Sequence, residues 1–153
     1  MRAVSGALAI VILGALGLVT PARGQPAADT AAIKQTALDY VEGWYEGNAE
    51  RMARALSPDL AKRNIVKDPQ TSKDTLEQMS KAELVKMTGE GVGTKTSKEN
   101  QQKDVTILDS YGSMASVKVV FADWVDYLHI AKINGRWVIV NVFWEFKPRA
   151  KQK

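Results

Sequence analysis

The sequence predicts an α+β fold, with helices gathered on one face of a curved antiparallel sheet. Three observations lead to this class. Apolar residues recur at helical spacing in the first half of the chain, and they alternate at strand spacing in the second half. The third observation is Asn134-Gly135, which lies between two long apolar runs. Asn-Gly is the strongest short-range hairpin signal, because both residues of the turn must adopt positive φ.

Chain length and composition indicate one ordinary globular domain. The chain has 153 residues, of which 45% are hydrophobic and 25% charged. Its formal charge of +4 falls to about +2 without Arg2 and Arg23, which lie in a leader expected to be removed. So small a charge argues against nucleic acid as a partner. With no cysteine and one histidine, the sequence predicts neither a disulfide framework nor a metal site, and it indicates no cofactor.

Residues 1–24 have the pattern of a signal peptide. Arg2 precedes an apolar segment, and Ala22 and Gly24 place small residues where a signal peptidase reads the chain. The apolar run is shorter than the about 20 residues that span a bilayer, so a cleaved signal is favoured over an uncleaved anchor.

Cleavage after this leader predicts a secreted or periplasmic protein that begins near Gln25 and is free of the membrane. Residues 25–30 then form a flexible lead. The folded domain is expected over residues 31–147, and residues 148–153 form a basic tail.

Two helices and a further helical turn are expected next. Residues 31–46 place their apolar side chains on one helix face. Gly47 ends this helix, and Asn48 can cap a second one over residues 49–56. Residues 57–63 begin with a capping hydroxyl followed by proline, which predicts a third, short helix.

The middle of the chain predicts two short strands, at residues 64–67 and 75–79, and one more helix. Ser80 starts that helix, because Glu83 completes a capping box. A glycine-rich segment, residues 89–93, ends it. This segment follows a helix and lacks the Lys-Ser/Thr ending of a phosphate-binding loop, so we interpret it as a flexible connector.

Four antiparallel strands are expected in the second half. Residues 103–109 and 114–123 form the first two, and the Asn134-Gly135 hairpin forms the others, with Ile133 opposite Arg136. Both faces of the hairpin are apolar, so each must be covered. One face carries Val125, Tyr127, His129, Ala131, Ile133, Val138, Val140, Val142 and Trp144. The other face carries Trp124, Asp126, Leu128, Ile130, Lys132, Trp137, Ile139, Asn141, Phe143 and Glu145.

Two segments carry a family resemblance: DYVEGWYEGNAERMARALSPDLAKR at residues 39–63 and WVDYLHIAKINGRWVIVNVFW at residues 124–144. They resemble the "putative lumazine-binding" family of small bacterial proteins, within the nuclear transport factor 2-like superfamily. The resemblance implies a cystatin-like cone, in which three N-terminal helices pack on a curved antiparallel sheet with a pocket between them. It also implies a homodimer formed through the outer sheet face. The resemblance assigns no lumazine or flavin contact to any residue of this sequence.

Position in the hairpin then assigns candidate residues. Counting from the turn, we expect the face with Tyr127 and His129 to point inward, where related enzymes carry an acid or base. The predicted pocket residues are Tyr40, Trp44, Val138, Val140, Val142 and Trp144. The predicted dimer face consists of Asp126, Leu128, Ile130, Trp137, Ile139, Asn141 and Phe143. Aromatic residues at helical spacing more often pack in the core than contact a ligand, so core packing is the alternative interpretation of Tyr40 and Trp44. The two interpretations agree if the pocket lies within that core.

Three functions remain open from the sequence. The first is an exported protein that binds a small hydrophobic or aromatic ligand in the cone. The second is an isomerase, dehydratase or cyclase, with His129 as general base and Tyr127 or Tyr40 as proton donor. A buried histidine without a catalytic role is the alternative interpretation of His129. The third is an accessory module that binds a protein partner.

Overall fold

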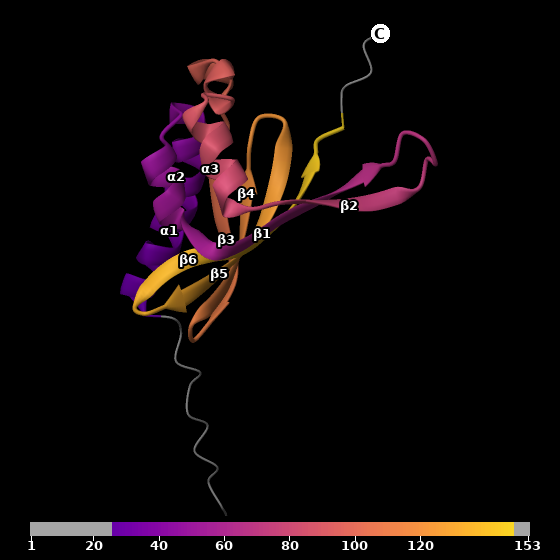
Figure 1. The fold of residues 1–153 in the computed structure, drawn as a ribbon. Helices are drawn as coiled ribbons and strands as arrows, with labels where there is room; N and C mark the ends of the chain where they lie inside the picture. Colours follow the sequence, from indigo (N-terminus) through magenta and orange to yellow (C-terminus); the bar gives the residue numbers. More distant parts are fainter. Residues whose placement is uncertain (1–25, 149–153) are drawn as a thin grey trace, which may run out of the picture.

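Six strands form one curved sheet, and the helices lie on one side of it in this computed structural model, which describes residues 26–148 (Figure 1). The predicted signal peptide, residues 1–24, and residues 149–153 of the basic tail lie outside the described residues. The strand order is β2-β1-β6-β5-β4-β3. The helices are α1 (Ala27–Glu46), α2 (Ala49–Ala55) and α3 (Lys81–Gly89), with 3₁₀ turns η1 (Gly93–Lys95) and η2 (Lys98–Asn100). The strands are β1 (Leu56–Lys67), β2 (Asp74–Met79), β3 (Asp104–Tyr111), β4 (Met114–Val120), β5 (Trp124–Ile133) and β6 (Arg136–Phe146).

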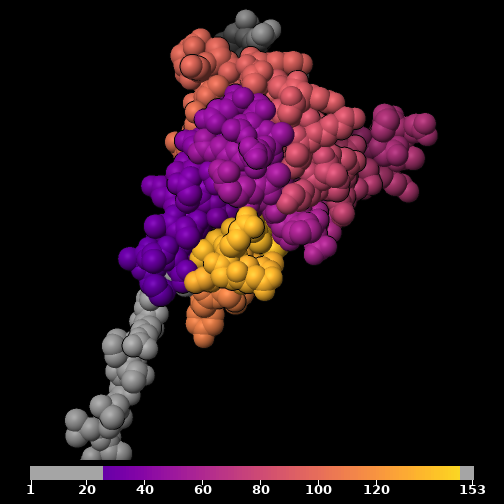
Figure 2. Space-filling model, turned by 60° about the vertical axis from the view of Figure 1, so that its left-hand side comes forward, coloured from indigo at the N-terminus to yellow at the C-terminus, as the bar shows by residue number. Residues whose placement is uncertain are grey.

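The α+β class and the curved sheet are confirmed, with one topological difference. The described strands pair antiparallel except β1 and β6, which are parallel. The β1–β2 hairpin reaches away from the helices (Figure 1). From the helical side, Figure 2 shows α1 in indigo to the left of the yellow start of β6, with the β1–β2 hairpin projecting at the right.

The break between the first two helices follows the sequence signals. Gly47 adopts a left-handed conformation with φ of 66°, and its backbone N–H donates to the carbonyls of the preceding turn. The side chain of Asn48 accepts a hydrogen bond from the backbone N–H of Arg51 and so caps α2. The helix α1 begins at Ala27, so the predicted flexible lead over residues 25–30 is wrong from Ala27 onward.

The short helix predicted over residues 57–63 is wrong, because this segment belongs to β1. Leu60, Lys62 and Asn64 are buried in alternation along this strand, which is strand periodicity. The lysine hid the pattern, because lysine is almost never fully buried unless it is paired. The third helix of the fold is instead α3, and its predicted capping box between Ser80 and Glu83 is confirmed.

The hairpin turn is confirmed, but the pairing register of its two strands shifts a few residues away from the turn. Asn134 and Gly135 have φ of 49° and 78°, and Ile133 pairs with Arg136. A β-bulge between His129 and Ile130 then pairs His129 with Asn141 and leaves Val140 as the extra residue. Val142 and Trp144 therefore lie on the opposite face from the one that simple alternation gives.

The predicted inner and outer faces of β5 are wrong. Asp126, Leu128 and Ile130 are at most 1% exposed and face the helices. Tyr127 and His129 are exposed on the outer face. Both faces of this strand carry apolar side chains, so hydrophobicity could not decide which one points inward.

Asp39 of α1 forms ion pairs with α2, and its carboxylate should make the free energy of unfolding depend on pH. Its carboxylate accepts hydrogen bonds from Arg51 Nε at 3.0 Å and Arg54 Nε at 3.1 Å, and the side chain is 11% exposed. Burial would raise its pKa, but the hydrogen bonds from Arg54, Arg51 and Gln35 outweigh burial and lower the pKa below 3.8. The resulting stability is present above the unfolded pKa and is lost as the pH falls through the folded pKa.

We therefore expect Asp39→Asn to cost about 1–2 kcal/mol of unfolding free energy at pH 7 and much less near pH 2, since charged hydrogen bonds contribute roughly that much. Urea unfolding at both pH values measures the difference. Asp59→Asn removes an exposed carboxylate and serves as the control. An equal loss at the two pH values would contradict the assignment.

Candidate functional site

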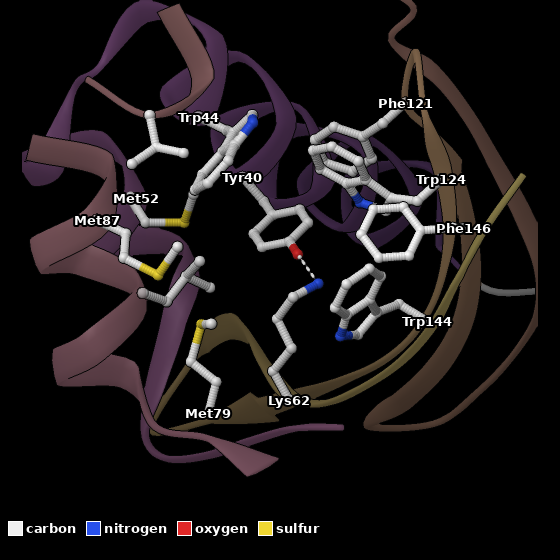
Figure 3. A pocket seen from close by; sticks show the side chains of 12 residues that line it. Tyr40, Trp44, Met52, Lys62, Met79, Met87, Phe121, Trp124, Trp144 and Phe146 are labelled. Carbon is white, nitrogen blue, oxygen red and sulfur yellow. Dashed lines mark hydrogen bonds between the residues drawn. The ribbon is translucent and has the colours of Figure 1, made fainter. Parts of the chain in front are cut away.

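A cavity of about 260 Å³ lies between the helices and the inner face of the sheet (Figure 3). Among the described residues that line it, Lys62 is the only charged one. The helices and the loop after α3 contribute Tyr40, Trp44, Met52, Leu84, Met87 and Val92. The sheet and the β4–β5 connection contribute Lys62, Met79, Phe121, Trp124, Trp144 and Phe146.

Aromatic rings form one wall of this cavity. Phe121 and Trp124 stack with ring centroids 4.5 Å apart, and Trp44 meets Trp124 edge to face at 5.9 Å. Trp144 continues the wall toward Phe146, with ring centroids 4.8 Å apart. Such contacts hold the rings in fixed orientations.

Methionines form the opposite wall, where Figure 3 shows Met52, Met79 and Met87 across from the rings. Methionine has three rotatable bonds and a polarisable sulfur, so this wall can adapt to the shape of a guest. One rigid aromatic wall and one adaptable wall suit a flat ring system.

Lys62, Tyr40 and Asp126 form a buried polar cluster beside the cavity. The Nζ of Lys62 donates to Tyr40 Oη at 3.0 Å and lies 3.1 and 3.3 Å from the two carboxylate oxygens of Asp126. The hydroxyl of Tyr40 donates to Asp126 Oδ2 at 2.5 Å. The Lys62 side chain is 7% exposed and that of Asp126 is fully buried. The three groups satisfy one another because little water reaches them.

Burial also brings the proton affinities of Lys62 and Asp126 closer together. Burial lowers the pKa of Lys62, and the neighbouring carboxylate of Asp126 offsets only part of that change. Burial raises the pKa of Asp126 despite Lys62 and Tyr40. Burial and the Asp126 carboxylate raise the pKa of Tyr40 well above its usual value. The difference between the pKa of Lys62 and that of Asp126 is therefore smaller than the difference between the free groups.

Two tryptophans extend the cluster into the cavity wall. The Nζ of Lys62 lies 4.8 Å from the ring centroid of Trp144, within cation–π range. The indole N–H of Trp124 is buried and makes no hydrogen bond of regular geometry with any described residue. It lies close enough to Asp126 to help lower the pKa of that carboxyl. This N–H is therefore directed toward the polar cluster and is covered by the surrounding side chains.

Half of the predicted pocket residues line the cavity. Tyr40, Trp44 and Trp144 do so. Val142 is fully buried in the hydrophobic core beside the cavity, and Val138 is 7% exposed. Val140 lies at the bulge and faces an open groove on the outer side of the sheet.

The candidate catalytic residues lie away from the cavity. Tyr127 is 50% exposed, and the His129 ring lies 3.5 Å from the Asn141 amide on the outer face. Neither residue lines the cavity. The geometry therefore gives His129 no role as a base for a ligand in the cone.

The predicted dimer face also has to be corrected. Most of its residues are buried inside the single chain, namely Asp126, Leu128, Ile130, Trp137 and Ile139. Asn141 and Phe143 lie on the outer face, where Phe143 pairs with Tyr127.

Sequence reasoning missed Lys62, Phe121 and Trp124 as cavity residues. The alternation in residues 60–64 was a usable signal for Lys62. The role of Asp126 depended on the true inner face, which the sequence pattern left ambiguous.

Within residues 26–148, no helix combines the length and apolar character that crossing a membrane requires. In the same residues, no three histidine or carboxylate side chains converge on a point where a metal ion could bind.

Comparisons with known proteins identify the family. The family model described as "Putative lumazine-binding" matches residues 28–145. No curated protein matches the sequence.

Solved structures show the same fold. A nuclear transport factor 2-like protein of unknown function from Shewanella baltica OS155 is similar with a TM-score of 0.59 and 17% identity, covering 81% of this chain and 98% of that one. A protein of unknown function with a cystatin-like fold from Nostoc punctiforme PCC 73102 has a TM-score of 0.57 and 15% identity, covering 84% and 98%. The chain belongs to the family described as "putative lumazine-binding", and it has the nuclear transport factor 2-like, cystatin-like fold.

Proposed function

We propose that this protein binds a small, largely apolar aromatic molecule inside the cone. The observation that carries the proposal is the aromatic- and methionine-lined cavity with a single polar cluster at its edge. Its volume of about 260 Å³ is just below the roughly 300–1,000 Å³ typical of pockets for drug-sized ligands. A ligand with a single aromatic ring or with two fused rings matches this volume.

Charge balance favours a neutral ligand. Lys62 and Asp126 already compensate each other, so an ionised ligand would bring an unpaired charge into a site with little water. The donors of Lys62 are already shared with Tyr40 and Asp126, so the ligand can carry few polar atoms. Lumazine has several polar ring atoms, and the cavity offers partners for few of them. The family description therefore points to a flat ring, and the cavity favours a less polar one.

The alternative functions have less support. An enzyme that uses His129 as base lacks the geometry, because His129 lies on the outer face. A module that acts only through protein contacts would not need an unfilled aromatic cavity.

We also propose that the protein is exported and forms a homodimer, now through the outer face around Tyr127 and Phe143, which are 50% and 44% exposed. Amino-terminal sequencing of the exported protein tests the first point, and a chain that retains residue 1 would contradict it.

Native mass spectrometry of the purified protein tests ligand and dimer together. It reports any retained small molecule and the subunit count, and a monomer at all concentrations would contradict the dimer.

Filling the cavity should abolish binding. We expect Met87→Trp to weaken the binding of 2-acetylnaphthalene at least about tenfold, since the added ring occupies volume that the ligand needs. Isothermal titration calorimetry measures the affinity. Met114→Trp makes the same change at a 60% exposed position outside the cavity lining and is the matched control. Equal affinity in both variants would contradict binding in the cone.

A further inference from the structure

We propose that Lys62 captures a small aromatic aldehyde or ketone in the cavity as an imine, with Asp126 and Tyr40 moving the protons. This inference rests on the proposed function, because it requires the aromatic group to occupy the cone. It adds covalent chemistry, and it narrows the ligand class to a ring that bears a carbonyl.

The position of Lys62 is the first argument. Its side chain is 7% exposed, and its Nζ reaches the centre of the cluster from the floor of the cavity (Figure 3). A buried ion pair is weak evidence for a stabilising role, because well-packed apolar side chains often replace such a pair without loss. A lysine amine in an apolar pocket is, in contrast, a recognised way to make the nitrogen nucleophilic.

The second argument is that the proton acceptor is already in place. Asp126 Oδ2 lies 3.1 Å from Nζ, so the carboxylate can take the proton that keeps the amine from attacking. Burial, which lowers the pKa of Lys62 and raises that of Asp126, favours this transfer. Tyr40 contacts both groups and can pass a proton between the nitrogen and the carbonyl oxygen.

The reaction balances without an oxidant or reductant. Asp126 removes one proton from the Lys62 ammonium, and the amine forms a bond to the carbonyl carbon. A second proton moves from the nitrogen to the oxygen through Tyr40, which gives a carbinolamine. Asp126 then returns its proton to the departing hydroxyl, the C–O bond breaks, and water leaves. The product is a protonated imine beside the Asp126 carboxylate.

The surroundings suit both the substrate and this product. The aromatic ring of the substrate can stack on the wall of Phe121 and Trp124. The imine keeps the positive charge of the lysine, and it remains between the Asp126 carboxylate and the face of Trp144, whose centroid is 4.8 Å from Nζ.

Reductive trapping tests the inference on the wild-type protein. The protein is incubated with 2-naphthaldehyde and cyanoborohydride, which reduces the imine to a stable amine, and peptide mapping locates the adduct. We expect Lys62 to be labelled at least about tenfold faster than Lys86, whose side chain is 75% exposed. From pH 8 to pH 6 the labelling rate of a free lysine amine, with a pKa near 10.4, falls roughly tenfold per unit, and the rate at Lys62 should fall less. Labelling of Lys62 no faster than Lys86 would overturn the inference.

Two further measurements separate failure of the chemistry from failure of binding. Binding of 2-methylnaphthalene, which has the ring but no carbonyl, is measured by native mass spectrometry. If it binds while Lys62 stays unlabelled by the aldehyde, the imine is overturned and the binding function stands. If neither compound binds, both proposals are overturned. Tyr40→Phe should slow labelling at least about tenfold while 2-methylnaphthalene still binds, and an unchanged rate would remove Tyr40 from the proton path.

Discussion

Asp126→Asn should destabilise the protein by about 3–5 kcal/mol at pH 7, as expected when one partner of a buried ion pair is removed. Asparagine keeps the shape and an acceptor for the Tyr40 hydroxyl, but it leaves the Lys62 ammonium without its counter-charge. Lys62 must then be buried as an isolated cation or give up its proton on folding, and both are costly. Urea unfolding followed by tryptophan fluorescence measures the loss.

The pH dependence of this loss identifies its cause. Without Asp126 the folded pKa of Lys62 falls further below its ordinary value of 10.5, whereas the unfolded chain keeps that value. The unfolded state then binds more protons, so stability rises with pH and the loss shrinks between pH 7 and pH 10. A loss that stays constant over this range would mean that packing, and not charge, is responsible.

A double-mutant cycle supplies the matched control. Lys62→Met keeps most of the length of the side chain and removes its charge, and the double variant with Asp126→Asn contains no buried charge at this point. We expect the double variant to be more stable than Asp126→Asn alone, with a coupling of about 1–3 kcal/mol between the two sites. Additive losses would show that the two groups do not act as a pair. A double variant close to wild type would show that the ion pair is not needed for folding, which leaves function as its reason.

Local signals in the sequence predicted much of the fold. The Asn134-Gly135 turn, the Gly47-Asn48 break and the Ser80 capping box each depend on the backbone preferences of a few neighbouring residues. Such preferences act in almost any context, so the structure keeps them. The hairpin turn and the starts of α2 and α3 could therefore be placed to within a residue.

The identity of the site depended on contacts between distant segments. Lys62 is buried because its partners Tyr40 and Asp126 come from α1 and β5, and no local pattern announces that pairing. The inner face of β5 was equally hidden, because apolar residues occupy both faces and the bulge at Val140 shifts the partner strand by one residue. Sequence periodicity shows that side chains alternate between the two faces of a strand, but only the tertiary packing determines which of the two sets of side chains points inward.

The loop after α3 illustrates the same limit, because it is part of the cavity wall. Gly93 is buried in this loop, which packs against Trp44 of α1. A Cβ at position 93 would lie 2.2 Å from the carbonyl oxygen of Trp44 and 2.6 Å from its ring. Glycine is therefore required here for close approach, and the interpretation of residues 89–93 as a mere connector misses this contact.

Gly93→Ala should consequently destabilise the protein by about 3 kcal/mol and displace Trp44 from the cavity wall. The obstructing atom belongs to the backbone of α1, so a side-chain rotation cannot relieve the overlap, and overpacking of this kind costs about 1–3 kcal/mol or more. Gly89→Ala is the control, because its Cβ would meet Ala49 Cβ at 3.3 Å and alanine favours the helix that contains it. Urea unfolding and calorimetric affinity for 2-acetylnaphthalene should both report a loss at position 93 and little change at position 89. Stability lost without any loss of affinity would mean that Trp44 is not part of the ligand site.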